Sequence, residues 1–469
     1  MKEDNIVATS RTKDLNVTEG PLLKKIIVFA IPLIITGLLQ QFYNAADLIV
    51  VGMFEGELAL AAVGSTGSLT NLIVGLFMGL SVGAGVSVAH LIGAKQYNEV
   101  KRVVHTAIPM AFVLGVAVCI VGLLFAPDLL RMMDNPENVI GQATVYIRII
   151  FLGLPASMVY NYAASMLRSS GDAKRPLIFL SISGLVNVGL NFILVSVFHM
   201  GVAGVAIATI TSQYLSATMA LVYMIRSKGH MHFSFKDICL DIPKLKKILY
   251  IGVPSGMQSC LFAIGNVMIQ SAVNSCGDTV VAGRAAAANL EGFVYISLNA
   301  LYHVSITFVG QAVGAKAYSR IKKIVAYSAV VVFVLGMAYT AIILGFHRQL
   351  VGLYAPDNEV VLKEALNSLK IVVPTYFLCG LMEIFSGAIR AMGKSVTAMV
   401  VTLIGACGLR ILWISTVFRF VQTSAIIYYS YPISWFLTMS CLLMFLINFV
   451  KKAKKENESD TLKILHSKL

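Results

Sequence analysis

The sequence has few charged residues and lacks the short motifs of the common enzyme and ATPase classes. Only 13% of its 469 residues are Asp, Glu, Lys or Arg, about half of the share that is usual in soluble domains. It holds no Gly-x-x-x-x-Gly-Lys nucleotide loop, no His-Glu-x-x-His zinc motif and no Gly-x-Gly-Asp motif. These absences argue against an enzyme and against ATP as the direct energy source.

Cysteine is scarce, and its spacing indicates no metal or disulfide framework. The seven cysteines occur singly, mostly inside apolar stretches, with no Cys-x-x-Cys pair. Such cysteines are typical of small buried hydrophobes. We therefore expect a chain without a resident cofactor.

Acidic residues are also scarce, with 23 Asp and Glu against 37 Lys and Arg, for a formal net charge of +14. The tails, the central linker and the loops around Lys95, Arg168, Lys316 and Arg390 hold 29 of the 37 basic residues. This pattern is typical of membrane topology and not of nucleic-acid binding. It predicts a multi-pass protein of the cell (inner or plasma) membrane with both termini in the cytoplasm.

Long apolar segments are abundant in the sequence. The chain is 57% hydrophobic, with a mean hydropathy of +0.80. A bilayer span needs about 20 mostly apolar residues, and twelve segments qualify, which predicts an all-α integral membrane protein. The predicted transmembrane helices are 24–52, 61–91, 103–126, 139–166, 176–197, 203–225, 246–274, 283–313, 324–346, 361–389, 395–418 and 424–450.

The two halves of the chain repeat each other. Gly93-Ala94-Lys95-Gln96-Tyr97 returns as Gly314-Ala315-Lys316-Ala317-Tyr318, and the turn 168–172 returns at 390–394, always 221 or 222 positions later. Repeated halves in a membrane are typical of secondary transporters, whose site lies where the halves meet. The predicted organisation is an N-terminal cytoplasmic tail (1–23), a six-helix bundle (24–225), a cytoplasmic linker (226–245), a second six-helix bundle (246–450) and a C-terminal cytoplasmic tail (451–469).

Asp47 is the clearest acid inside a predicted span. It follows Tyr43 by one helical turn, so both side chains lie on one face, and Asn187 and Asn191 share a face in the same way. Ionisable groups in hydrocarbon are costly and mark functional sites by default. A carboxylate among amides and hydroxyls fits a proton or a sodium ion, while the alternative is a structural hydrogen-bond cluster.

The second half carries different charges inside its spans. Ile269 stands where the repeat would place a counterpart of Asp47, while Glu291, Glu383 and Arg410 fall inside the eighth, tenth and eleventh predicted spans. A buried arginine needs a partner, and the sequence offers Glu383 or Glu291. A structural ion pair and a role toward substrate or proton both fit this pattern.

Pro32 and Pro254 lie early in the first predicted helix of each half. Proline removes a backbone hydrogen bond and permits a bend. The bend is either a static kink that helps packing or a helix that straightens and bends during transport.

Over essentially its full length the chain resembles the multidrug and toxic compound extrusion (MATE) family, with Glu383 before Ser386-Gly387 similar to the branch of Gram-positive bacteria. The resemblance implies two pseudo-symmetric six-helix bundles around a central cavity, and export of cationic amphipathic compounds against a proton or sodium gradient. The residues that carry it are Pro32, Gln40, Tyr43, Asn44, Asp47 and Gly52 in the first span, both Gly-Ala-Lys loops and the Arg168-Ser-Ser-Gly-Asp turn.

The resemblance also implies the sites. Many members carry an aspartate where this chain has Asn191, which weakens a sodium site, and no acid lies between Gly252 and Asn274, where a subgroup has one. The implied cation-coupling residues are Asp47, Asn187, Asn191, Thr209, Tyr43 and Asn161, and a sodium ion would be held by Asp47, Asn187 and Asn191. The expected substrate cavity includes Gln40, Asn44, Glu291, Glu383 and Arg410, and the expected helix-bending residues are Pro32 and Pro254.

The sequence thus predicts a monomeric secondary active multidrug exporter that works by antiport. A lipid-linked oligosaccharide flippase of the same superfamily is the alternative. It would be expected to have a more basic cavity and often extra spans, so twelve spans with intramembrane acids favour drug export. A channel is a further alternative, against which the repeated halves argue.

Overall fold

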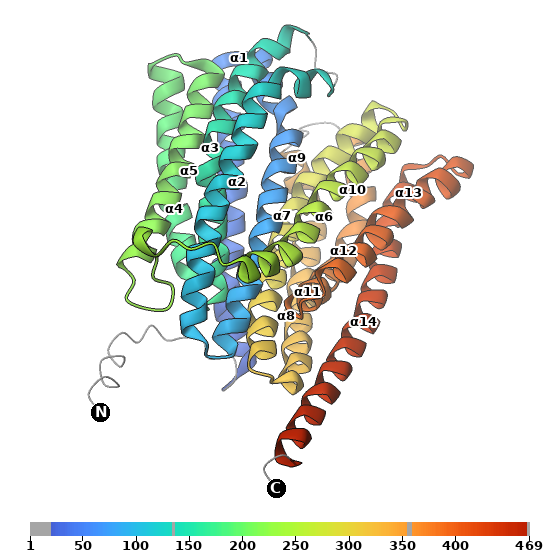
Figure 1. Ribbon diagram of the computed structural model, residues 1–469. Coiled ribbons are helices and arrows are strands. Elements are labelled where there is room, and N and C mark those ends of the chain that lie inside the picture. Colours follow the sequence, from blue (N-terminus) through green and yellow to red (C-terminus); the bar gives the residue numbers. More distant parts are fainter. Residues whose placement is uncertain (1–19, 134–136, 354–358, 467–469) are drawn as a thin grey trace. The chain divides into compact units, whose positions relative to one another are not determined.

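The computed structural model describes residues 20–133, 137–353 and 359–466. Within these residues every regular element is a helix (Figure 1). The long helices are α1 (Leu22–Gly93), α2 (Tyr97–Arg131), α3 (Glu137–Ser169), α4 (Lys174–Phe192), α5 (Gly201–Arg226), α6 (Ile242–Asn274), α7 (Asp278–Gly314), α8 (Tyr318–Gly345), α10 (Glu359–Val372), α11 (Tyr376–Ala391) and α14 (Ser424–His466).

Short helical segments join or extend these helices. They are the π-helical segments η1 (Ile193–Val197), η4 (Leu403–Gly408) and η5 (Ile414–Phe418), the 3-10 turns η2 (Phe235–Asp237) and η3 (Val373–Thr375), and the short helices α9 (His347–Gly352), α12 (Ser395–Thr402) and α13 (Leu409–Trp413).

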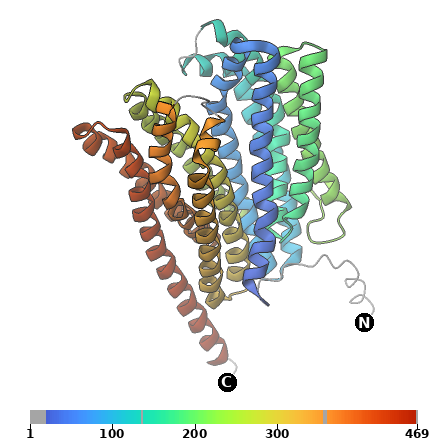
Figure 2. The ribbon, with the colours of Figure 1, turned by 180° about the vertical axis from the view of Figure 1, so that it is seen from behind.

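Twelve helical stretches in the described residues are long and apolar enough to cross a membrane, which confirms the predicted number. The first two stretches carry one label, α1. They are two helices that meet directly at a kink, where Gly56 has a non-helical φ of +79°. Figure 2 shows the first part of α1 as one long dark-blue helix. Only glycine adopts this φ without strain, so residue 56 is where the chain turns back toward the second span.

The repeated loops adopt the same backbone conformation. In both Gly-Ala-Lys loops the lysine lies in the left-handed region, at φ +57° for Lys95 and +55° for Lys316. Gln96 N–H donates to Leu91 O, and Ala317 N–H donates to Ala312 O, at 2.8 Å in each case. Both helices therefore end in a Schellman motif, which stops the helix by satisfying its last carbonyls.

The described residues form two compact units, one of residues 35–256 and one of residues 20–34 with 257–466. The core of the first unit lies among α2, α3 and the second part of α1, where Phe77, Phe151 and Met158 are almost fully buried. The sequence predicts the division at the linker 226–245, whereas these units divide inside α1 and α6. Residues 20–34 pack instead with the second unit, as in the edge-to-face contact between Phe29 and Phe308.

Glycines hold the start of α6 against the first unit. A Cβ atom on Gly83 would lie 2.0 Å from Ile248 O, and one on Gly79 would lie 2.4 Å from Gly256 N. Small residues allow membrane helices to approach at backbone distance. This close crossing explains why the unit boundary falls after residue 256 and not at the linker.

The linker is bound to α2 within the first unit. Thr106 Oγ1 donates to Cys239 O at 3.1 Å and accepts the Asp241 N–H at 3.3 Å. His105 Nε2 accepts the Ser234 N–H at 3.0 Å. Both side chains are buried, so the linker is an ordered part of this unit.

We predict that Gly83→Ala destabilises the protein by about 1–3 kcal/mol, because the new methyl group forces α1 and α6 apart. The melting temperature of purified protein, measured by fluorescence size-exclusion chromatography, should fall. Gly64→Ala is the matched control, since no atom lies within 4 Å of the Cβ position there. An equal melting temperature for both variants would contradict the proposed close packing.

Candidate functional site

A polar contact in the first unit joins two residues that the sequence predicts together. Asn191 on α4 donates a hydrogen bond from Nδ2 to the carboxylate of Asp47 on α1. Asn191 is fully buried, and its Oδ1 has no hydrogen-bond partner among the described residues. A buried carbonyl oxygen without a donor is costly. The pair therefore presents carboxylate and amide oxygens, the ligand type that small hard cations prefer.

Tyr43 is held one turn before Asp47 by close packing against α4. Its hydroxyl donates to Ser181 O at 3.3 Å. A Cβ atom at Gly184 would lie only 1.9 Å from the tyrosine ring, so the ring occupies the space that a side chain would need. Because residue 184 is glycine, the Tyr43 face of α1 packs directly against α4.

The other predicted coupling residues lie in the same unit, but Thr209 and Asn161 form their hydrogen bonds away from Asp47. Asn187 is buried one turn before Asn191 on α4. Thr209 on α5 donates to Val205 O at 3.0 Å, and Asn161 on α3 donates to Ser157 O at 2.8 Å. The amide hydrogens of Asn161 and the hydroxyl of Thr209 are thus engaged within their own helices, as is common for polar residues in apolar helices.

Tyr146 on α3 is a member of this cluster that the sequence analysis missed. It is 8% exposed and interacts electrostatically with Asp47. A single tyrosine inside an apolar span has no distinctive spacing, so only the tertiary structure reveals this neighbour.

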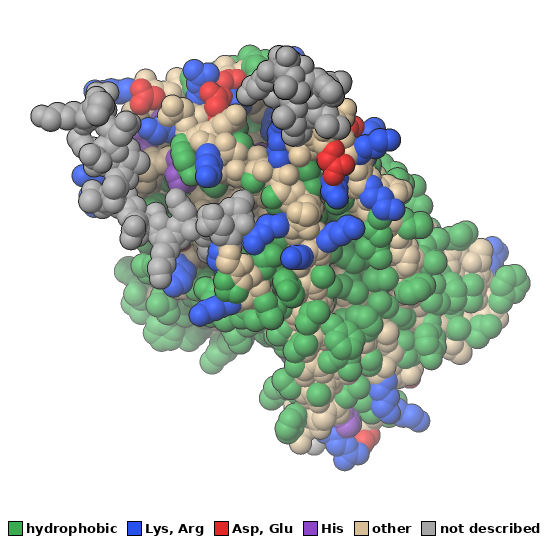
Figure 3. Space-filling model, turned by 90° about the horizontal axis from the view of Figure 1, so that it is seen from below, with side chains coloured by type: hydrophobic (Ala, Val, Ile, Leu, Met, Phe, Trp, Pro, Cys, Tyr) green, Lys and Arg blue, Asp and Glu red, His purple; other side chains and the backbone are tan. Residues whose placement is uncertain are grey.

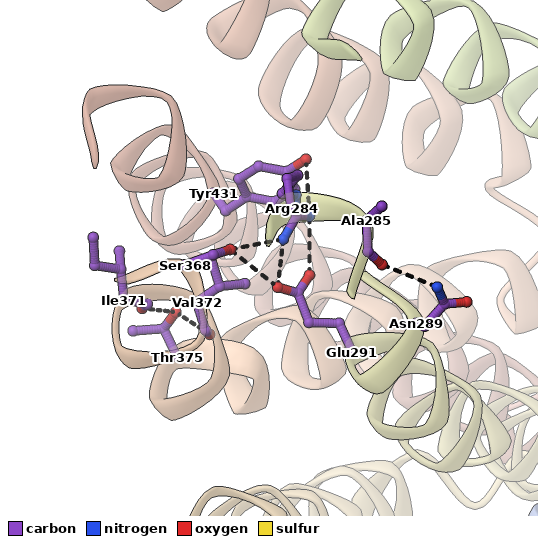
Figure 4. Close-up of polar contacts among 9 residues, drawn as sticks. All are labelled: Arg284, Ala285, Asn289, Glu291, Ser368, Ile371, Val372, Thr375 and Tyr431. Carbon is purple, nitrogen blue, oxygen red and sulfur yellow. Dashed lines mark hydrogen bonds and ion pairs between the residues drawn. The ribbon is translucent and has the colours of Figure 1, made fainter. Parts of the chain in front are cut away.

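A buried ion pair organises the second unit (Figure 4). Arg284 and Glu291, both on α7, meet through two N–H···O contacts of 2.5 and 3.0 Å. Arg284 also donates to Ser368 on α10 at 2.9 Å and to the Tyr431 hydroxyl on α14 at 3.4 Å. The seven-residue spacing places both charges on one helix face. That spacing was a readable signal, and the sequence analysis overlooked Arg284.

Neither acid that the sequence offers as a partner for Arg410, Glu383 or Glu291, is bonded to it in the described residues, and Glu291 is bonded instead to Arg284. Arg410, on α13, donates from Nε to Ser434 Oγ at 2.8 Å. Its guanidinium carbon lies 4.2 Å from the centre of the Tyr431 ring and 5.5 Å from that of Trp435. It forms no ion pair within the described ranges, with Glu383 or with any other acid.

Glu383, on α11, lies near a different arginine. It interacts electrostatically with Arg390, two turns later on the same helix. Arg390 is buried and donates to the Tyr302 hydroxyl and to Gln258 Oε1. The carboxylate of Glu383 has no hydrogen bond or ion pair in the part of the chain that the structure describes.

The remaining predicted residues belong to the first helix of each half. Gln40 and Asn44 are exposed on α1. Pro32 and Pro254 are buried, and each lies two residues before the point where its helix passes from one unit to the other. The prolines thus stand where a bend would change the direction of a shared helix.

Lys and Arg side chains gather on the face seen from below, and hydrophobic side chains cover the flanks (Figure 3). Together with twelve apolar helices, an internal repeat and polar clusters inside the helices, this surface defines a multi-pass membrane transporter.

The MatE family model matches residues 32–193 and 254–416. The chain therefore belongs to the MatE family of multidrug and toxic compound extrusion transporters. The two matched segments begin 222 positions apart, in agreement with the repeat in the sequence.

Relatives with known names support the same class. The probable multidrug resistance protein YoeA of Bacillus subtilis (strain 168) is 27% identical over 391 residues, 82% of this chain and 84% of that protein. The multidrug export protein MepA of Staphylococcus aureus (strain MSSA476) is 25% identical over 400 residues, 84% of this chain and 88% of that one. These names favour multidrug efflux over the flippase alternative.

A solved structure shares the fold. The outward-facing conformation of a multidrug resistance MATE family transporter superposes with a TM-score of 0.89 at 22% identity, covering 95% of this chain and 100% of that one. This similarity confirms the twelve-helix fold.

We predict that the Arg284–Glu291 pair is a structural element. Glu291→Gln leaves a buried arginine without its counter-charge and should lower the free energy of unfolding by about 3–5 kcal/mol. The double variant Arg284→Met with Glu291→Leu should regain native stability or exceed it. Thermal unfolding of the purified variants measures both effects, with Glu458→Gln, an exposed acid, as the control.

The same double variant should keep the native rate of dye export. A stable double variant that no longer exports would show that Glu291 acts on the transported compound, as the sequence analysis allowed.

Proposed function

We propose that this protein exports amphipathic, mostly cationic compounds by antiport with protons or sodium ions through alternating access. The observation that carries the proposal is the Asp47–Asn191 contact, in which a carboxylate is held inside the helices beside an amide oxygen without a donor. Such a group is expensive in a membrane and marks a functional site. A coupling ion is the partner that this oxygen set fits.

In this proposal the coupling ion binds to Asp47. A proton on the carboxylate would remove a buried negative charge, and a sodium ion would neutralise it with help from the Asn191 oxygen. Asn187 and Tyr43 border the same site. Either ion lowers the cost of keeping Asp47 inside the membrane, which couples ion binding to the conformation that buries the residue.

The prolines supply the movement. Because Pro32 and Pro254 lie next to the points where α1 and α6 change units, a change in the bend of either helix alters both units at once. We infer that ion binding at Asp47 changes the bend of α1 at Pro32, and that this change releases the transported compound from its site. The site for the transported compound then opens alternately to the two sides of the membrane.

The transported compound is recognised by acids and by apolar surface. Gln40 and Asn44 on α1 supply polar contacts, and Glu383 supplies an unpaired carboxylate for a cationic centre. Aromatic and methionine side chains adapt to compounds of different shape. We place the protein in the cell membrane with both termini in the cytoplasm, acting as a monomer and without nucleic acid, cofactor or catalysis.

We predict that Asp47→Asn abolishes gradient-driven export while leaving the fold intact, because the amide carries no charge for an ion to neutralise. Native and variant protein are reconstituted in liposomes loaded with ethidium, and a proton gradient or a sodium gradient is imposed separately. The native protein should respond to one of them. Asp128→Asn is the matched control, since Asp128 is an exposed acid.

Full gradient-driven export by the Asp47→Asn variant would contradict the proposed coupling role of Asp47. If the native protein responds to neither gradient, antiport itself is rejected, and lipid-linked substrates become the next class to test.

We predict further that Glu383→Gln reduces export of cationic dyes severalfold more than export of neutral dyes, because the carboxylate attracts only the former. Initial efflux rates of paired dyes in the same liposomes measure the difference. Equal losses for both dyes would assign Glu383 a structural role instead.

A further inference from the structure

A groove of about 210 Å³ lies between α13 and α14 in the second unit. Its lining residues fall within 409–416 on one side and within 430–437 on the other. On each side they follow the spacing i, i+3, i+4 and i+7, so each helix contributes one continuous face. Figure 1 shows α13 beside the first turns of α14. The groove therefore runs along the two helices and not across them.

The groove lies on the side of α13 that faces away from α6. Cys407 contacts α6, since a Cβ atom on Gly265 would lie 3.1 Å from its Sγ. With about 3.6 residues per turn, Leu412 and Thr416 lie on the opposite side of the helix. Leu412 is 57% exposed, within the apolar candidate span Ser395–Phe418. Lipid chains are therefore the surroundings of the groove.

The walls of the groove offer no free hydrogen-bond donor. The hydroxyl groups of Thr416, Ser430 and Ser434 each donate to a carbonyl of their own helix, and Trp413 Nε1 donates to Ile426 O at 2.9 Å. A site for drug-like cargo needs placed polar groups and usually measures about 300–1,000 Å³. This smaller groove with satisfied donors fits a narrow apolar chain instead.

Arg419 stands at one end of the groove. Its backbone is still helical, and it follows Thr416 by three residues, so it lies on the groove face. The candidate span ends at Phe418, which places Arg419 at the level of the lipid headgroups. Its side chain forms no hydrogen bond or ion pair with the described residues, and Glu364 accepts a hydrogen bond from Ser424 at this end instead.

The length of the groove matches one leaflet of a bilayer. Leu409 and Arg419 are ten residues apart, which corresponds to about 15 Å along a helix. The hydrocarbon core is about 30 Å thick, so one leaflet contributes about half of it. An arginine at headgroup level above an apolar groove of this length is complementary to a phospholipid, since guanidinium groups bind phosphate through two parallel hydrogen bonds.

We propose that the groove binds one anionic phospholipid, whose phosphate contacts Arg419 and one of whose acyl chains lies between α13 and α14. A headgroup with a net negative charge is favoured, because the positive charge of Arg419 is unbalanced by any described acid. A choline headgroup is net neutral and gains less from the same contact. This site lies outside the proposed coupling and cargo residues and does not depend on the export function.

The tryptophans of the chain make the groove observable. There are two: Trp413 lines the groove, whereas Trp435 is buried. Brominated acyl chains quench tryptophan fluorescence on contact, so the full chain is placed in phosphatidylcholine vesicles that contain brominated phosphatidylglycerol or brominated phosphatidylcholine. The anionic lipid should reach half-maximal quenching at about one fifth of the mole fraction, the scale of one basic side chain at an anionic surface. Trp413→Phe should remove this quenching.

Two variants with matched controls test the two halves of the contact. Arg419→Gln should abolish the preference for the anionic lipid, whereas Arg131→Gln, at an exposed arginine of the first unit, should keep it. Ile433→Phe fills the groove and should lower quenching by both lipids. Met444→Phe, at an exposed position of α14 outside the groove, should leave quenching unchanged. Equal quenching by both lipids, or a preference that persists in Arg419→Gln, would overturn the proposal.

Thermal unfolding in detergent gives a second measurement that needs no tryptophan variant. A lipid that binds only the folded chain raises its melting temperature. Phosphatidylglycerol should raise it more than phosphatidylcholine does, and Arg419→Gln should lose the difference. An equal rise with inorganic phosphate would assign Arg419 to a free anion, and displacement of the brominated lipid by ethidium would assign the groove to cargo. Either result would show that the lipid assignment is wrong.

Discussion

The absence of water inside the bilayer is the constraint on which this structure depends. A backbone that cannot bond to water must satisfy itself, so every regular element in the described residues is a helix. The same constraint makes each buried charge expensive. Asp47, Glu291, Glu383 and Arg410 persist in the helices under this penalty, and each therefore needs either a bonded partner or a functional reason.

The two units meet this penalty differently. In the first unit the Asp47 carboxylate takes a hydrogen bond from Asn191, whose own oxygen is left without a donor. In the second, Arg284 and Glu291 neutralise each other, while Arg410 rests between aromatic rings. A neutralised pair costs less to keep buried than a single charge, whereas an unbalanced group is left to respond to ions or to cargo. This difference is the reason why we propose coupling in the first unit and charge recognition in the second.

Internal repetition gives the two units a common backbone but not a common chemistry. The Schellman turns at Lys95 and Lys316 and the π-helical segments η1 and η5 recur at matching places. Asp47 has no counterpart in the second half, where Ile269 stands. A duplicated scaffold thus supports two distinct polar clusters, joined by helices that begin in one unit and continue in the other.

The sequence by itself determined the twelve spans and the repeat, and it predicted a functional role for Asp47, because apolar length, fixed spacing and a charge in hydrocarbon are local properties. It also placed Asn191 near Asp47, through residues that match the family. The pairing of Arg284 with Glu291 was readable in the seven-residue spacing on α7. Only the tertiary structure decided the partner of Arg410, because the packing of α13 against α14 brings Ser434 to it. The unit boundary inside α6 likewise depends on glycine contacts between helices far apart in sequence, which no local pattern encodes.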